Sequence, residues 1–469
     1  MIEGTQEEPR GMAAGSSWRD RLLALKQGMG PLWWHAALIF VASRIADVAN
    51  VYIGVLFLPA ALSQKELGAV DPVTRLASFA SIPIAIISMV GAKYLSAYQA
   101  RNESGKIKQF VRDMAWLGLV AAILFTASLL LTFEFFRVRL GIEHRFLLPA
   151  LCALGIISCW QPLAQVVLQG MQKFNTAALM VVGGPLLRVG LILSLVPLLH
   201  LSGFLFATFI SGVLVVALSM WSARKYMDRS VKCEAYYAEW RGILAFAWPV
   251  AILICAGALQ GFVEPFVIKH FLSDADAAGF YMVSRFGGIP SFLVGAIGFV
   301  LFPLMSGKHE RGEDTVGHLR QALGVALLVS GGSTLVLGVS SPWLFGLLPQ
   351  WRPFVPYAPL IWLVGLQVTI DAAISIYGTH EVACRRFRFL RVVVPVAILD
   401  IILLYGSFGW NELQGWLPED VWAAVQGAIP RTLTYAVAVM CSTRLVAAAV
   451  LLLTETRRNG APAGRLQDT

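Results

Sequence analysis

Long, continuous apolar runs separated by short polar or charged segments dominate the chain. A helix needs about 20 mainly apolar residues to cross the hydrocarbon core of a bilayer. Because the runs are continuous and do not alternate with polar residues, they predict membrane-spanning helices and not the strands of a barrel. We predict twelve spans, near residues 34–60, 70–96, 114–134, 147–170, 176–199, 201–222, 242–271, 279–305, 322–346, 355–378, 391–409 and 432–454.

The second half of the chain repeats the pattern of the first half, and Arg285 lies 210 positions after Arg75. A gap-free alignment at this offset also matches Leu62 with Leu272, Ser63 with Ser273, Arg101 with Arg311 and Glu103 with Glu313. Internal duplication is typical of transporters built from two halves. We therefore predict an all-α polytopic membrane protein whose two six-helix lobes are related by a pseudo-two-fold repeat.

The charged segments between the apolar runs predict the domain boundaries. The longest basic segment joins the two halves, so we interpret it as a cytoplasmic linker. The predicted parts are a tail at 1–33, an N-lobe at 34–222, the linker at 223–241, a C-lobe at 242–454 and a tail at 455–469. We expect an interfacial helix in the N-terminal tail and another in the outer loop 411–429, where apolar residues recur at helical spacing.

Composition excludes several classes of protein. Charged residues make up 14% of the 469 residues and hydrophobic residues 57%, which is far from the balance of a soluble domain. The net charge of +9 is spread over alternate loops, so it indicates membrane orientation, with both termini cytoplasmic, and not nucleic-acid binding. The six cysteines form no CxxC or Cys/His cluster, and no catalytic or nucleotide-binding motif is present. We expect no metal site, no cofactor and no enzymatic activity.

Ionisable residues inside the first predicted span are the first candidates for a functional site. Each such group near mid-membrane costs on the order of 2.5–3.5 kcal/mol, so it persists where it contacts water, a partner or a substrate. Arg44, Asp47 and Asn50 recur every three residues and form a polar stripe on one helical face. The stripe predicts a cavity lining. The alternative is an Arg44–Asp47 pair that neutralises itself without a ligand.

Arginines in three other spans extend this candidate site. Arg75 and Arg285 each lie near the outer end of a span, where either alone could reach the headgroups. At equivalent positions of two repeats, however, they are expected on opposite walls of a central cavity. Guanidinium binds phosphate in a bidentate manner. We therefore predict that Arg44, Arg75 and Arg285, together with Arg188 in the fifth span, bind an anionic, diphosphate-containing headgroup.

The second half carries a separate group of candidates. Glu264, Asp400 and Thr434 offer oxygen atoms for a proton or a sodium ion, which would couple transport to an ion gradient. In the alternative interpretation, Asp400 and Arg444 form a purely structural ion pair. The sequence leaves both interpretations open.

Two six-span repeats, the polar stripe of the first span and the repeated arginines resemble the polysaccharide-transport (Wzx-type) flippases of the multidrug/oligosaccharidyl-lipid/polysaccharide exporter superfamily. Segments 271–285 and 170–174 are similar to stretches of that family, and the resemblance covers about residues 34–454. It implies passage of an undecaprenyl-diphosphate-linked oligosaccharide from the cytoplasmic to the outer leaflet of the bacterial inner membrane by alternating access. It also implies a role in lipopolysaccharide O-antigen or exopolysaccharide synthesis, beside glycosyltransferases, a polymerase and membrane lipids.

Two other functions are the alternatives. A multidrug or cation antiporter of the same superfamily is expected to have a mainly acidic cavity, whereas Arg44, Arg75 and Arg285 have the opposite charge. A membrane-embedded polymerase or glycosyltransferase is expected to carry a large outer loop, and every predicted outer loop is small. Lipid II flippases typically carry two further C-terminal spans, so lipid II is not the expected substrate.

Overall fold

The computed structural model describes most of the predicted spans and the connections between them. The described residues are 31–86, 91, 95, 98, 101–142, 146–170, 174–224, 232–234, 240–292, 294, 301, 305, 315–384, 386–409 and 432–459. The predicted interfacial helices of the N-terminal tail and of loop 411–429 lie outside these residues, as does most of the predicted linker.

Helices of three kinds make up the described part of the chain. The first half contains α2 (Pro31–Val51), the π-helix η1 (Tyr52–Phe57), α3 (Leu58–Ala61), α4 (Gln64–Leu67), α5 (Val70–Ser78), the 3-10 helix η2 (Phe79–Ser81), α7 (Ser104–Leu140), α8 (Leu147–Gly170) and α9 (Phe174–Ala223). The second half contains α10 (Trp240–Phe271), α11 (Asp274–Gly287), α13 (Val316–Leu347), the 3-10 helix η5 (Pro349–Tyr357), α14 (Leu360–Ala383), α15 (Leu390–Phe408) and α17 (Leu433–Asn459). No strand occurs among the described residues.

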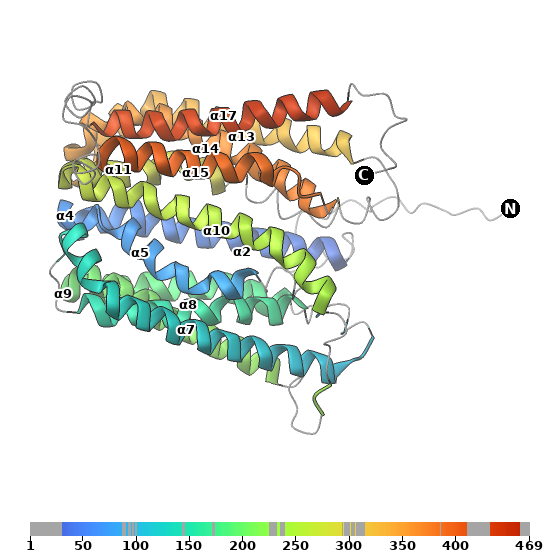
Figure 1. The fold of residues 1–469 in the computed structure, drawn as a ribbon. Coiled ribbons are helices and arrows are strands. Elements are labelled where there is room, and N and C mark those ends of the chain that lie inside the picture. Colours follow the sequence, from blue (N-terminus) through green and yellow to red (C-terminus); the bar gives the residue numbers. More distant parts are fainter. Residues whose placement is uncertain are drawn as a thin grey trace, which may run out of the picture.

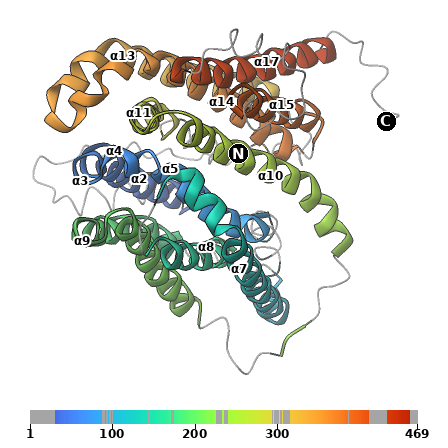
Figure 2. The same ribbon diagram turned by 60° about the vertical axis from the view of Figure 1, so that its left-hand side comes forward.

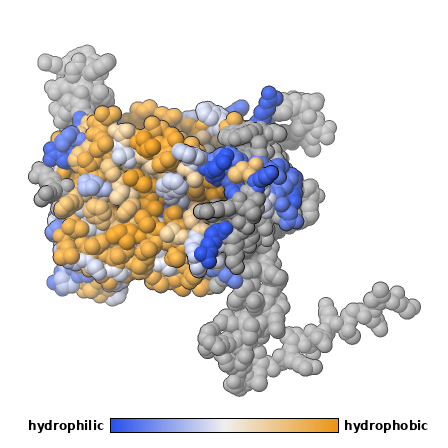
Figure 3. All heavy atoms as spheres, turned by 90° about the horizontal axis from the view of Figure 1, so that it is seen from below, coloured by the Kyte–Doolittle hydropathy of each residue, from blue (hydrophilic) through white to orange (hydrophobic). Residues whose placement is uncertain are grey.

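Ten of the described helical stretches are long and apolar enough to cross a membrane. They correspond to eleven of the twelve predicted spans, because α9 is one continuous assignment over two of them. Much of the remaining span, 279–305, lies outside the described residues. Figure 3 shows apolar side chains covering the middle of the molecule and hydrophilic ones gathered toward the ends, as expected for a protein surrounded by lipid.

The two arms of α9 fold back on each other at His200, whose backbone angles (φ 52°, ψ −132°) are not helical. Gly203 follows this turn, and a Cβ atom there would lie 2.3 Å from the carbonyl oxygen of Leu195. A larger residue at 203 would therefore push the arms apart. The turn falls between the predicted spans 176–199 and 201–222, and it makes α9 a helical hairpin.

The helices form two lobes, an N-lobe of α2 to α9 and a C-lobe of α10 to α17 (Figures 1 and 2). In the N-lobe, α8 packs against α7 and α9, and α2 packs against α9. In the C-lobe, α14 packs against α13 and α17, and α15 packs against α10 and α17. The described chain begins in α2 and ends in α17 at the same end of the bundle (Figure 1). The structure thus confirms the predicted all-α fold with two lobes.

The lobes meet where the sequence repeat is clearest. Ser63 and Ser273, 210 positions apart, both cap a helix and accept a hydrogen bond from the amide three residues later, at 3.3 and 3.1 Å. The flanking helices end and begin at matching positions, Ala61 and Phe271 before the serines and Gln64 and Asp274 after them. The repeated Leu-Ser pair is therefore a repeated helix start.

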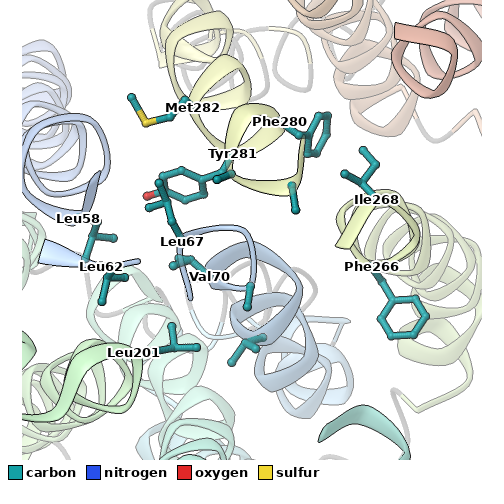
Figure 4. Close-up of a cluster of buried hydrophobic side chains, with 14 of the residues drawn as sticks. Leu58, Leu62, Leu67, Val70, Leu201, Phe266, Ile268, Phe280, Tyr281 and Met282 are labelled. Atoms are coloured by element: carbon teal, nitrogen blue, oxygen red, sulfur yellow. The ribbon is translucent and has the colours of Figure 1, made fainter. Parts of the chain in front are cut away.

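Buried apolar side chains of both repeats join the lobes at this place (Figure 4). Leu67 and Val70 of the N-lobe and Tyr281 and Met282 of the C-lobe belong to the cluster. A Cβ atom on Gly68 would lie 2.6 Å from the Cβ of Ala277, so α4 and α11 touch almost backbone to backbone. The close crossing brings the polar side chains of α5 and α11 within reach of each other.

Candidate functional site at the lobe interface

The polar face of α2 lies between the two lobes. Arg44 forms the expected ion pair with Asp47, with Nη2 and Oδ2 2.9 Å apart. Arg44 also donates a hydrogen bond to the main-chain carbonyl of Phe292 in the C-lobe. The self-neutralising Arg44–Asp47 pair is therefore present, and Arg44 contacts the opposite lobe in addition.

Arg188 on α9 approaches the same face from within the N-lobe. Its guanidinium donates to the side-chain oxygen of Asn50, one of the predicted site residues. Its Nε atom is buried and has no hydrogen-bond partner among the described residues. Arg285 of the C-lobe lies against Gly54, four residues after Asn50, where a Cβ atom on Gly54 would be 3.3 Å from its Cδ atom. Two guanidinium groups from opposite lobes therefore lie near one another.

Arg285 is held by two groups at this interface. It forms an ion pair with Asp71 on α5, and its guanidinium carbon lies 4.9 Å from the ring centre of Tyr281. The contact with the ring is a cation–π interaction. The side chain is 40% exposed, while its Nε atom is buried and has no hydrogen-bond partner among the described residues.

The two repeat-related arginines have different neighbours. Arg75 is exposed and extends to α10, where a Cβ atom on Gly261 would lie 3.5 Å from its Nη1 atom. Arg285 instead pairs with Asp71. The position of Asp71 in the first repeat corresponds to Tyr281 in the second, so the repeat supplies a carboxylate on one side only. The sequence symmetry predicted an arginine pair, and the structure gives an arginine–aspartate pair between lobes.

The π-helix η1 provides a second link between the lobes. A π-helix departs from the regular i to i−4 pattern and occurs often at functional sites. The hydroxyl of Tyr281 donates to the carbonyl of Gly54 at 3.1 Å, and the indole N–H of Trp351 donates to the carbonyl of Val55 at 2.7 Å. We call these two bonds, with the Asp71–Arg285 pair, the interlobe clasp. Sequence reasoning missed Asp71 and Trp351, although Asp71 lies one helical turn before Arg75.

A buried acidic cluster surrounds Arg444 in the C-lobe. Arg444 forms ion pairs with Glu264 on α10, with Asp371 on α14 at 3.5 Å and with Asp400 on α15 at 3.1 Å. Glu264, Asp400 and Arg444 are buried, whereas 48% of the Asp371 side chain is exposed. The cluster holds one guanidinium and three carboxylates. It therefore contains both Glu264 with Asp400, the residues of the predicted ion site, and the Asp400–Arg444 pair of the structural alternative.

Two neutral side chains complete the shell around Asp400. Thr443 donates to one carboxylate oxygen at 2.7 Å, and Gln260 donates to the other at 3.0 Å. The structure thus places Thr443 at Asp400, while Thr434 lies nine residues earlier on α17, about 13 Å along the axis at 1.5 Å per residue. Gln260 precedes Glu264 by one turn, a spacing that could have indicated it. Among the described residues, no group of three or more His, Cys, Asp or Glu side chains is arranged to hold a metal ion.

Comparisons with known proteins agree with this architecture. A family model described as polysaccharide biosynthesis protein matches residues 61–309, more than half of the chain. Comparison with curated protein sequences gave no significant match. Among solved structures, the lipid II flippase MurJ in an inward closed conformation superposes with a TM-score of 0.64 at 12% identity, over 90% of this chain and 87% of that chain.

Two multidrug transporters have a similar fold. An inward-facing multidrug resistance MATE family transporter of the MOP superfamily gives a TM-score of 0.61 at 13% identity, over 89% of this chain and 94% of that chain. A mutant of the Vibrio cholerae MATE transporter VcmN gives a TM-score of 0.57 at 13% identity, over 89% of this chain and 97% of that chain. At such identities these likenesses describe the fold. Taken with the family match, they make this chain a member of the polysaccharide biosynthesis protein family, built on the two-lobe fold of the MOP-superfamily transporters.

Proposed function

We propose that this protein flips a polyprenyl-diphosphate-linked oligosaccharide from the cytoplasmic to the outer leaflet of the bacterial inner membrane. The lipid tail stays in the bilayer while the polar headgroup passes between the lobes. Glycosyltransferases would supply the substrate, and a polymerase would use it for a surface polysaccharide such as O-antigen or exopolysaccharide. Among the predicted ligands, Arg188 and Arg285 are the central pair, with Arg44, Asp47, Asn50 and Arg75 on the surrounding walls.

The observation that carries this proposal is that Arg188 of the N-lobe and Arg285 of the C-lobe reach the same short stretch of chain, at Asn50 and Gly54, from opposite sides. Two like charges held near each other in a low-dielectric surrounding repel strongly. A diphosphate removes this repulsion and offers oxygen atoms to both guanidinium groups. An anionic ligand that contacts both lobes at once is also suited to drive a rearrangement of one lobe against the other.

A multidrug or cation antiporter is the second candidate, because MATE transporters share the fold. The charges at the interface weigh against it. Arg188, Arg285 and Arg44 would repel a cationic drug, and the acids beside them, Asp71 and Asp47, are already paired with arginines. The interface is better suited to an anion.

We propose that the C-lobe cluster couples flipping to a proton or a sodium ion at Glu264 and Asp400. Three carboxylates outnumber the one guanidinium of Arg444, so the cluster retains capacity for a further positive charge. Thr443 and Gln260 hold the Asp400 carboxylate in place. Thr434 was part of the same predicted site and lies outside this shell.

Reconstitution in proteoliposomes tests the function directly. The purified protein should transfer a fluorescent undecaprenyl-diphosphate-linked sugar between leaflets, measured as the fraction that dithionite can bleach. An analogue with a neutral group in place of the diphosphate should not be transferred, because it offers no charge to Arg188 and Arg285. Transfer of both probes at equal rates, or transport of a cationic dye in place of either, would contradict the proposal.

The proposed orientation places the basic loops in the cytoplasm. Gly317 at the start of α13 and Gln64 at the start of α4 are both exposed and suit cysteine labels. In intact cells, an impermeant maleimide should label the Gln64→Cys variant and leave Gly317→Cys unlabelled until the cells are opened. The reverse pattern would show that the chain is inserted the other way round. Gly105 is unsuitable for a label, because a Cβ atom there would lie 2.7 Å from the carbonyl of Lys232.

A further inference from the structure

A cavity of about 400 Å³ lies inside the N-lobe, separate from the clasp and from the C-lobe cluster. This volume is within the range of small-molecule sites, about 300–1,000 Å³. Its walls come from α2, α8 and both arms of α9. One wall runs from Arg188 back to Ala177, eleven residues earlier on α9, which corresponds to about 16 Å of helix. The cavity therefore begins at one of the proposed diphosphate ligands.

The cavity has a polar strip within a mainly apolar lining. On the second arm of α9, Thr208, Ser211 and Ser219 follow helical spacing, and all three line the cavity. Gln161 lines it from α8, and a Cβ atom on Gly212 would lie 2.9 Å from the amide nitrogen of Gln161. The second arm of α9 and one residue of α8 thus supply the polar strip, and apolar residues of all four segments line most of the rest.

The lining offers both hydrogen-bond donors and hydrogen-bond acceptors. The hydroxyls of Thr208, Ser211 and Ser219 donate to carbonyls of their own helix, at 2.9, 2.9 and 2.7 Å, which leaves their oxygen atoms as acceptors. Gln161 has an amide with two N–H donors. The Nε–H of Arg188 is buried and has no hydrogen-bond partner among the described residues. A ligand rich in hydroxyl groups can satisfy both sets.

Two parts of the proposed substrate compete for this cavity, the sugar and the polyprenyl chain. The polyprenyl chain is already surrounded by hydrocarbon in the bilayer, and inside the cavity it would leave the hydrogen-bonding groups of the polar strip without partners. A sugar, in contrast, carries hydroxyl groups that are costly to place in lipid without partners. The sugar attached directly to the diphosphate must also lie next to whichever arginine binds the diphosphate, and Arg188 is at the cavity's edge.

We infer that this N-lobe cavity is a subsite for the first sugar of the lipid-linked oligosaccharide, the one bonded to the diphosphate. The inference rests on the proposed function and adds a specificity determinant to it. Gln161 and Arg188 donate to the sugar, Thr208, Ser211 and Ser219 accept from it, and the apolar wall contacts its C–H face. The identity of the first sugar would then affect binding, while sugars further from the lipid would not.

The test compares the affinity of the purified protein for two kinds of probe. One is undecaprenyl diphosphate, and the other is the same lipid carrying glucose, galactose or N-acetylglucosamine, with binding followed by native mass spectrometry. At least one monosaccharide probe should bind about tenfold more tightly than the sugar-free lipid, as one or two additional hydrogen bonds would give. Gln161→Leu, which keeps most of the side-chain volume, should remove this difference and leave the affinity for undecaprenyl diphosphate unchanged.

Two further variants keep the result interpretable. Ser211→Ala removes one acceptor with little change in volume and should reduce the sugar preference a fewfold even if Gln161→Leu folds poorly. Ser194→Leu changes an exposed serine of α9 outside the cavity and should have no effect. Equal affinity for all three monosaccharide probes and the sugar-free lipid would overturn the subsite. Equal loss of both kinds of probe in Gln161→Leu would also overturn the subsite, because the effect would then not depend on the sugar. Failure of every probe to bind would instead refute the proposed function.

Discussion

Replacing Arg444 with glutamine is expected to remove most of the folded protein from the membrane. The guanidinium contacts Glu264, Asp371 and Asp400, and the first and last of these are buried. Removing one partner of a buried ion pair leaves an uncompensated charge and costs about 3–5 kcal/mol. This is comparable with a large part of the stability of a typical domain, about 5–15 kcal/mol. Membrane abundance and the midpoint of thermal unfolding in detergent measure the effect.

Variants of the three acids give the matched controls. Asp371→Asn should be mild, because that side chain is 48% exposed and lies 3.5 Å from the guanidinium. Asp400→Asn combined with Arg444→Gln should recover only part of the abundance, since Glu264 stays buried without a partner. Adding Glu264→Gln should recover the rest. Wild-type abundance of Arg444→Gln alone would mean that the cluster does not stabilise the fold.

The same set of variants separates coupling from structural pairing. If Glu264 and Asp400 bind the coupling ion, the triple variant should be folded yet unable to flip lipid under an ion gradient. If the cluster is structural, the triple variant should flip at the wild-type rate. Gradient-driven transfer in proteoliposomes distinguishes the two results, and a wild-type rate would remove both acids from the proposed coupling site.

Arg188→Ala and Arg285→Ala are each expected to lower the flipping rate at least about a hundredfold while the protein stays folded. Each loses a charge-assisted bidentate contact to the diphosphate, worth about 1.5–3 kcal/mol per hydrogen bond. Arg→Lys should restore the rate only in part, because a point charge replaces the planar fork. The dithionite assay measures the rate, and the unfolding midpoint checks the fold. Full activity of either alanine variant would exclude the diphosphate contact at that residue.

Arg75→Ala serves as the comparison, because Arg75 is exposed and lies beside Gly261 of α10. The flipping rate of Arg75→Ala should fall less than that of Arg285→Ala, the variant of its repeat counterpart.

Asp71→Asn distinguishes ligand binding from the interlobe clasp. It breaks the ion pair but leaves Arg285 free for the diphosphate, so affinity for undecaprenyl diphosphate should rise, whereas Arg285→Ala should lower it. A fall in affinity for both would mean that the pair acts only to hold the lobes together.

The clasp also explains how substrate binding would be transmitted to the fold. Asp71 is paired with the guanidinium that we propose binds the diphosphate, so such a ligand would compete with the clasp for Arg285. A bound diphosphate would weaken one of the three clasp contacts. The bonds from Tyr281 and Trp351 to the carbonyls of η1 would then be left to hold the lobes at this end. Competition of this kind converts binding energy into a shift between two lobe arrangements.

The apolar runs determined where the helices of this protein lie, although individual boundaries differ, as for α7 (Ser104–Leu140) against the predicted span 114–134. The cost of leaving a polar backbone or side chain in lipid is a local property, so it can be read along the sequence. The offset of 210 residues therefore predicted that Ser63 and Ser273 occupy equivalent places, and both cap helices. The mismatch of Asp71 with Tyr281 can be read in the sequence, but its consequence, an ion pair between the lobes, is seen only in the tertiary structure.

The partner of each charge was decided only by the tertiary structure. The sequence identified Arg285, Arg444 and Asp400 as costly groups inside spans, but their contacts join residues up to 214 positions apart. Such pairs depend on how the two lobes cross and on the rotation of each helix about its axis, which hydrophobicity alone does not define. The π-helix at Tyr52–Phe57 is a similar case. The carbonyls of Gly54 and Val55 in this helix accept hydrogen bonds from donors of the other lobe, and the sequence does not indicate these partners.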